Sequence, residues 1–100
     1  MKKLYGTYVR LVKTTYHYTE SLAVIAVDKH NDPVTDISVC LPDFNLQESK
    51  ELAFVDINNN PGIEKFLTKN KIAVNTGITF RSGYVEYPLY RFDLNKLEEY

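Results

Sequence analysis

The sequence predicts an α+β fold in which an antiparallel sheet of about five strands carries one helix. Three observations lead to this class. Residues 4–18 are rich in Val, Thr and Tyr and strand-like runs follow to residue 41, one stretch near residue 60 carries the start and stop signals of a helix, and strand-like alternation returns after it. A chain of 100 residues has the size of one domain, so we expect a single globular domain over residues 1–100.

Composition limits the classes of function. The formal net charge of −1 argues against a general DNA-coating protein and against a polyanionic DNA mimic. The single cysteine excludes an internal disulfide and a Cys-rich zinc site. Arg10 and Lys13 interrupt the apolar core that a signal peptide would need, and no apolar run approaches a membrane span. We therefore expect a cytoplasmic protein without membrane association.

The first part of the chain is expected to form an antiparallel meander. In residues 4–18 the apolar positions change parity at Leu11-Val12, which predicts a bulge or bend there. Residues 22–29 open with six apolar residues in a row, which is typical of a central strand covered on both faces. After a turn at residues 30–33, residues 34–41 alternate, which predicts that Ile37, Val39 and Leu41 share one side and that Asp36 and Ser38 face the other.

Residues 54–67 carry the strongest local signals. Asn60 is a good N-cap and Pro61 suits the first helical position, while Ile63, Phe66 and Leu67 share one face. Asn70 can adopt the left-handed conformation that ends a helix. We predict a short strand over residues 53–57 and a helix over about residues 61–70; residues 42–53 fit a short helix or a loop equally well.

The last third returns to strands. Residues 73–77 look irregular, and Gly83 can supply the positive φ of a tight turn between two strands. Pro88 cannot donate to a ladder, so its strand should lie at an edge or be bulged there. Asp93 is expected to cap a short final helix that turns Leu94 and Leu97 inward.

Two stretches of the second half resemble a known family. They are Ala53-Phe54-Val55-Asp56 with Asn58-Asn59-Asn60-Pro61, and Ser82-Gly83-Tyr84 with Tyr87-Pro88-Leu89-Tyr90-Arg91-Phe92-Asp93-Leu94. Together they are similar to short uncharacterised proteins associated with plasmids and conjugative elements of Gram-positive bacteria. The resemblance implies a bacterial protein encoded on a mobile element, and it assigns no catalytic residue.

Residues with metal or catalytic potential have simpler explanations. Asp56, Asn58 and Asn60 have the spacing of the first EF-hand ligands, but Pro61 replaces the required glycine, so we favour helix capping. Cys40 has no base beside it in sequence, and His17 and His30 would have to reach it through the fold. The carboxylates of Asp43, Glu48, Glu51 and Asp56 are expected to form a solvated face. We predict no catalytic residue, no metal and no cofactor.

Two binding functions stay open from the sequence. The run at residues 84–92 holds four aromatic side chains in nine residues, and exposed Tyr and Arg are enriched at protein interfaces. The sequence therefore favours a non-enzymatic accessory protein that binds a protein partner or a second copy of itself. The candidate protein-binding residues are Tyr84, Tyr90, Arg91 and Phe92.

The alternative function is single-stranded nucleic-acid binding by the first strand. Basic residues and tyrosines alternate there ahead of the first acidic residue, Glu20. Such a surface holds single strands by stacking bases and by contacting phosphates. The candidate residues are Tyr8, Arg10, Lys13, Tyr16 and Tyr18.

Overall fold

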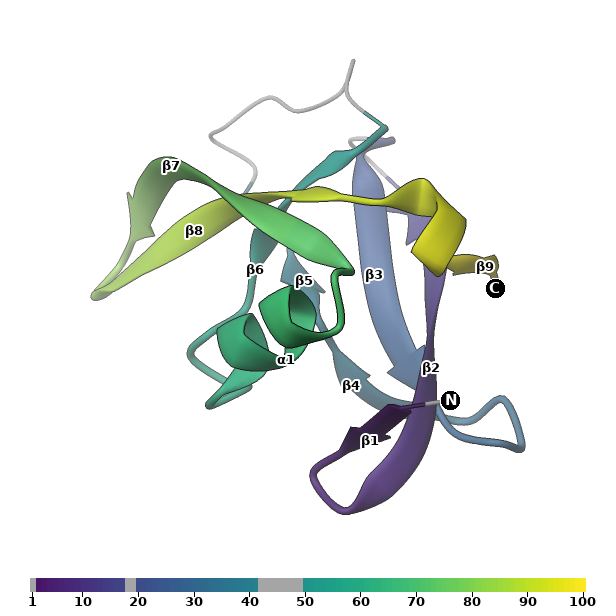
Figure 1. Cartoon of the computed structure of the whole chain (residues 1–100). Coiled ribbons are helices and arrows are strands. Elements are labelled where there is room, and N and C mark those ends of the chain that lie inside the picture. The colour runs from purple at the N-terminus through teal and green to yellow at the C-terminus, as the bar shows by residue number, and fades with distance from the viewer. Residues whose placement is uncertain (1, 18–19, 42–49) are drawn as a thin grey trace.

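Two small sheets pack around a common core in the computed structural model, which describes residues 2–17, 20–41 and 50–100 (Figure 1). The first sheet contains β1 (Lys2–Leu4), β2 (Thr7–Thr15), β3 (Leu22–Val27) and β4 (Pro33–Asp36), with β9 (Glu98–Glu99) added to β2. The second has the order β5 (Ser38–Val39), β6 (Leu52–Val55), β8 (Val85–Phe92) and β7 (Ala73–Ser82). Helix α1 (Ile63–Lys69) and the 3-10 turn η1 (Leu94–Lys96) complete the fold. The α+β class is confirmed, with the strands divided between two sheets.

The meander predicted for the first part of the chain is present, and β3 lies between β2 and β4 as expected. However, β2 pairs with β3 without a register shift from Arg10 to Thr15, so the bulge predicted at Leu11-Val12 is absent. Both residues are buried instead, because this part of the sheet is covered on both faces. The register shift of the meander lies between Ala26 and Val27, where β3 pairs with β4.

The chain passes from one sheet to the other at Ile37. Its N–H donates to the Val24 carbonyl of the first sheet at 2.9 Å, and its carbonyl accepts from Asp56 N–H, after β6, at 2.9 Å. Ile37 is fully buried, but Val39 and Leu41 belong to a second, smaller apolar cluster. The predicted strand over residues 34–41 is therefore two short strands. Ser38, predicted to face outward, is buried at this crossing.

The main core lies between the two sheets and α1. It includes Leu11, Val24, Ile37, Val55, Ile63, Leu67, Tyr90 and Phe92. The second cluster, built on Leu41, Phe54 and Leu89, covers the other face of the second sheet. Both faces of this sheet thus carry apolar residues, and on β8 Tyr90 and Phe92 pack in the main core while Tyr87 and Leu89 pack in the second cluster.

Helix α1 starts later than predicted and has different caps. Gly62, with φ of 79°, occupies the N-cap position, so Pro61 precedes the helix, and no side chain caps it. Asn60 is buried and uses its amide elsewhere. At the other end, Lys71 adopts the left-handed conformation (φ 56°) that was predicted for Asn70.

The β7–β8 hairpin begins at Ala73, so the segment predicted to be irregular is a strand with a bulge. Its register shifts between Asn75 and Thr79, opposite the position of Pro88, which agrees with the bulge expected there. Gly83 has the predicted positive φ, 63°, in the turn. Asp93 caps η1 as expected, and its carboxylate accepts from Asn95 N–H at 3.0 Å.

Candidate functional site

Strand β7 forms a long free edge. Within the described residues it pairs with β8 alone, and Figure 1 shows the β7–β8 hairpin reaching away from the rest of the molecule. The other edge strands of the two sheets are two to four residues long, and the longest of them, β4, starts with Pro33. Proteins usually shorten such edges or block them with Pro and Lys. β7 spans ten residues without Pro or Lys, although it carries Arg81 and a bulge between Asn75 and Thr79.

Apolar side chains are exposed along this edge. Val74 is 70% exposed, Ile78 is 50% exposed, and Tyr84 at the hairpin tip is fully exposed. Between them, the bulge is held by local hydrogen bonds, in which Asn75 Oδ1 accepts from Gly77 N–H at 2.8 Å and the Thr76 hydroxyl donates to the Leu89 carbonyl at 2.8 Å. The edge is therefore an ordered surface with apolar groups in solvent.

The predicted protein-binding residues separate into two groups. Tyr84 and Arg91 are exposed, and Arg91 Nε lies 4.0 Å from the Glu51 carboxylate. Tyr90 and Phe92 are only 2% and 1% exposed, so the prediction that they contact a partner is wrong. Both side chains project from the face of β8 that contacts the main core, where they pack with α1.

Tyr90 has a structural partner in the core. Its hydroxyl donates to the Glu64 carboxylate on α1 at 2.6 Å. Burial, together with this hydrogen bond, raises the pKa of Tyr90, so the side chain stays neutral and ties β8 to the helix.

The basic residues of the predicted nucleic-acid surface form ion pairs with acidic residues of β9. Arg10 Nη1 lies 2.8 Å from Glu98 Oε1, and Lys13 Nζ lies 3.6 Å from Glu99 Oε1. These acids reach the first strand because β9 pairs in parallel with β2. Tyr8 is 61% exposed and has the ammonium of Lys3 5.7 Å from its ring centroid.

The remaining tyrosines of this set do not extend the surface. Tyr16 is half-buried, and its hydroxyl shares a 2.6 Å hydrogen bond with Ser38. Burial raises the pKa of Tyr16 to about 12, although the bond to Ser38 lowers it. Tyr18 lies outside the described residues. The four described candidates thus do not form one basic aromatic face.

The calcium-like spacing has a structural explanation. Asp56 accepts from Asn59 through its N–H at 3.2 Å and its side-chain amide at 2.9 Å, while Asn60 is enclosed by backbone groups. In the ranges that the structure describes, no three His, Cys, Asp or Glu side chains gather as metal ligands would. Cys40 is half-buried, and Asp43 and Glu48 lie outside the described residues.

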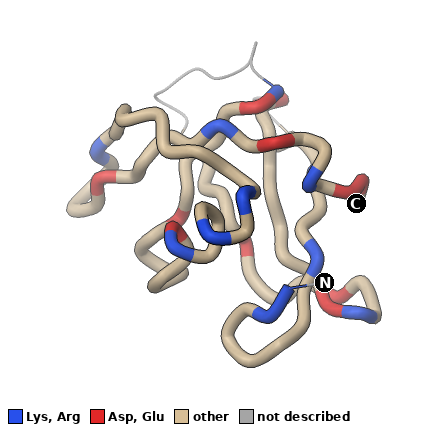
Figure 2. The backbone as a smooth tube through the Cα atoms, viewed as in Figure 1, with Lys and Arg blue, Asp and Glu red and all other residues tan. Residues whose placement is uncertain are grey.

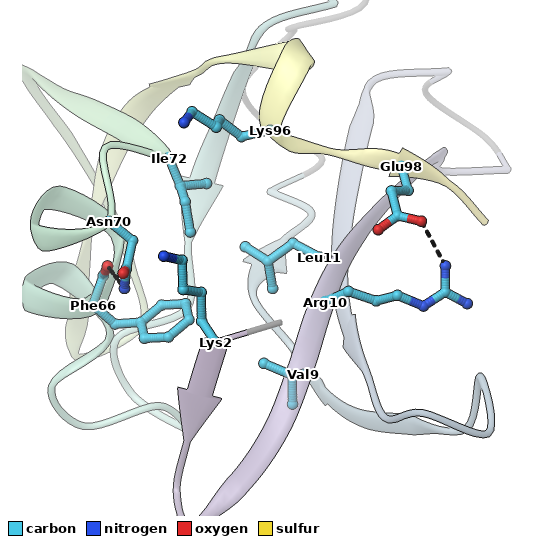
Figure 3. A pocket seen from close by; sticks show the side chains of 9 residues that line it. All are labelled: Lys2, Val9, Arg10, Leu11, Phe66, Asn70, Ile72, Lys96 and Glu98. Atoms are coloured by element: carbon cyan, nitrogen blue, oxygen red, sulfur yellow. Dashed lines mark hydrogen bonds and ion pairs between the residues drawn. The ribbon is translucent and has the colours of Figure 1, made fainter.

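A pocket that sequence reasoning missed lies between β1, β2, α1 and η1 (Figure 3). Its volume is about 210 Å³. Four apolar and five polar side chains from distant segments line it: Val9, Leu11, Phe66 and Ile72, with Lys2, Arg10, Asn70, Lys96 and Glu98. Only the fold brings these segments together, so no local motif could have revealed it.

The family model described as "Domain of unknown function (DUF4313)" matches residues 11–100. The chain belongs to this family. The DUF4313 region contains the whole second sheet, α1 and β9, whereas β1 and the start of β2 precede it. The match therefore extends well beyond the two stretches in which the resemblance was noted. No curated protein and no solved structure matches the chain.

The helices of this DUF4313 chain are short. Among the described residues, none has the length and apolar character that crossing a membrane requires.

Proposed function

We propose that this DUF4313 domain is a small non-enzymatic accessory protein that binds a partner protein along β7. The partner contributes an extended segment, which adds to the second sheet as a further strand. The observation that carries this proposal is the edge of the ten-residue strand β7, which is open on both sides of the bulge between Asn75 and Thr79, while the other sheet edges of the described residues are short.

The exposed side chains support the same surface. Backbone hydrogen bonds along an added strand contribute only about 0.5–1.5 kcal/mol each, so recognition also needs side-chain contacts. Val74 and Ile78 supply apolar contacts along the edge, and Tyr84 offers a large amphipathic side chain at the tip. Tyr is among the residues enriched at interface centres.

The setting of this function is part of the proposal. The resemblance to proteins of plasmids and conjugative elements supports a role for a mobile element within a bacterial cytoplasm. An accessory protein of this kind acts by holding another protein, so its side chains do not need acid–base chemistry. The side chains of Tyr90 and Asp56 make structural hydrogen bonds, which fits a non-enzymatic protein.

The test is a pull-down from a Gram-positive bacterial lysate with the tagged chain, with and without nuclease. The double variant Val74→Lys with Ile78→Lys places charges on the β7 edge, where they oppose strand addition. Val34→Lys is the matched control, because Val34 is 37% exposed on the edge strand of the other sheet.

We expect one discrete protein that survives nuclease, binds the Val34→Lys control and is lost from the double variant. With the purified chain and a peptide of the partner, protection of the β7 backbone amides from hydrogen exchange then confirms the added strand. Recovery of nucleic acid, with proteins lost on nuclease treatment, would contradict the proposal. Light scattering that showed a stable dimer, abolished by the double variant, would assign the edge to a second copy instead.

A further inference from the structure

We propose that the pocket between β1, β2, α1 and η1, here called the lysine pocket, binds a small organic phosphate monoester with a compact apolar body. This site is separate from the β7 edge and does not depend on the protein-binding function. Three features of the pocket favour this ligand: the charges at its rim, the apolar residues of its floor and the position of Glu98.

Two lysines face the lysine pocket. Lys2 on β1 and Lys96 on η1 both line it, and neither has an ion pair within the described residues. In Figure 3 the side chain of Ile72 lies between the ammonium groups of Lys2 and Lys96, and Figure 2 shows basic positions on β1, α1 and η1 around this region. Two positive charges around one cavity favour an anionic ligand there.

The floor of the pocket is apolar. Val9, Leu11 and Ile72 belong to the main core and are at most 5% exposed, and the half-buried ring of Phe66 forms one side. The volume of about 210 Å³ is smaller than the roughly 300–1,000 Å³ of pockets that hold drug-sized ligands. It therefore suits a compact ligand whose apolar part covers the floor while its charged end meets the lysines.

The charges favour phosphate over carboxylate. A phosphate monoester carries a charge of about −1.5 to −2 at neutral pH, which matches two ammonium groups. Lysine binds phosphate as a point charge, whereas a planar carboxylate is best recognised by the fork of an arginine. The arginine of this pocket, Arg10, is already engaged by Glu98 and by Asn31.

Arg10 prepares the pocket by controlling Glu98. The Glu98 carboxylate lines the cavity and would repel a dianion, but Arg10 binds it at 2.8 Å and neutralises it. In Figure 3 this ion pair lies at the side of the pocket away from Lys2 and Lys96. Arg10 is thus a positioning residue for the site.

The experiment is an NMR titration of the full chain with phenyl phosphate, followed by amide chemical shifts. We expect saturable shifts at Phe66, Ile72 and Lys96. Lys2→Gln and Lys96→Gln should each weaken binding about tenfold, because each removes one charge-assisted contact. Lys29→Gln, in the exposed turn between β3 and β4, is the matched control and should bind like the wild type.

Two further ligands and two variants separate the parts of the proposal. Benzyl alcohol tests the floor without the phosphate, and inorganic phosphate tests the charge without the floor; both should bind at least about tenfold more weakly than phenyl phosphate. Arg10→Met frees Glu98 and should weaken phenyl phosphate binding, whereas the double variant Arg10→Met with Glu98→Gln should restore it. A merely structural role of Arg10 would not give this rescue.

Three results would overturn the proposal. They are the absence of saturable shifts at millimolar phenyl phosphate, shifts that map to other residues, and equal affinity of the wild type and the two lysine variants. Circular dichroism confirms that each variant is folded. Because β7 takes no part in these measurements, their outcome is independent of the pull-down.

Discussion

Asn60 joins the two sheets through one side chain. It is fully buried, and its amide oxygen accepts from the Thr35 hydroxyl at 2.6 Å. Its amide nitrogen donates to the carbonyls of Asp36 at 2.8 Å and Asp56 at 3.0 Å. The end of β4 is thereby tied to the turn that follows β6, next to the crossing at Ile37.

We expect Asn60→Ala to lower the free energy of unfolding by about 1–3 kcal/mol or more. The change leaves the Thr35 hydroxyl and two carbonyls without their partner in a buried place. Urea denaturation measures the loss. Asn58→Ala is the control, since Asn58 is exposed, and it should stay within about 0.5 kcal/mol of the wild type. Equal stability of the two variants would contradict this role of Asn60.

The role of Asn60 could not be predicted from its neighbours. An Asn followed by Pro and by an apolar helical face is typical of an N-cap, and the helix does begin shortly after Asn60. The amide is instead used by Asp36, which is 24 residues away in sequence, and such tertiary partners leave no local pattern. The same holds for Ser38, which the alternation placed outside and which binds Tyr16 and Val24 N–H inside.

Tyr16 makes stability sensitive to alkaline pH. Burial raises its pKa to about 12 in the folded state, from the value near 10 of an unfolded chain. Between these values the unfolded chain releases a proton that the folded chain keeps, so stability is fully present below pH 10 and falls as pH rises toward 12. Tyr90, whose pKa is also raised, adds to the same loss.

We therefore expect Tyr16→Phe to make the alkaline fall in stability shallower, by up to about 1.4 kcal/mol per pH unit. Urea unfolding at about pH 9 and about pH 11 measures the slope. Parallel slopes for the wild type and the variant would show that Tyr16 does not titrate in this window.

At the scale of the elements, the end of α1 is built on an unusual residue. Lys71 N–H donates to the Thr68 carbonyl at 3.1 Å and Ile72 N–H donates to the Leu67 carbonyl at 2.9 Å, which is a Schellman motif. Leu67 and Ile72 pack in the main core, as this motif favours. Its left-handed position holds Lys71 rather than glycine.

Lys71→Gly should stabilise the chain by about 1 kcal/mol, because the left-handed backbone costs a non-glycine residue about that much. Lys69→Gly, inside the last turn of the helix, should destabilise it by about 1 kcal/mol, since glycine is a poor helix former. Thermal or urea unfolding compares the two variants. A loss of stability in both would refute the assignment of the motif.

Elements with a regular period were predictable, and irregular ones were not. The apolar run of β3 and the helical face of Ile63 and Leu67 follow their periods, so the central strand and the helix were predicted correctly. β7 was missed where it bulges, because residues 75–79 carry polar groups that bond locally and hide the alternation. For this reason Val74 and Ile78 did not enter the predicted protein-binding site.

At the scale of the molecule, the chain uses long-range pairings to close a small fold. The alternation of residues 34–41 cannot show that the chain changes sheets at Ile37, since both halves are strand-like. The pairing of β2 with β9 is likewise invisible to local patterns, and it decides that Arg10 and Lys13 are ion-paired instead of free. The class of the fold could be predicted, but the electrostatic character of its first strand could not.

The pairing of β2 with β9 also orders events in folding. Arg10 and Glu98 lie 88 residues apart, whereas β2 and β3 are joined by a short turn. Contacts that close long loops form late, so we expect the β2–β3 hairpin in the folding transition state and β9 to dock after it. In stopped-flow kinetics, Val24→Ala should then slow refolding, while Leu97→Ala, at the entry to β9, should mainly speed unfolding. Equal slowing of refolding by both would reverse this order.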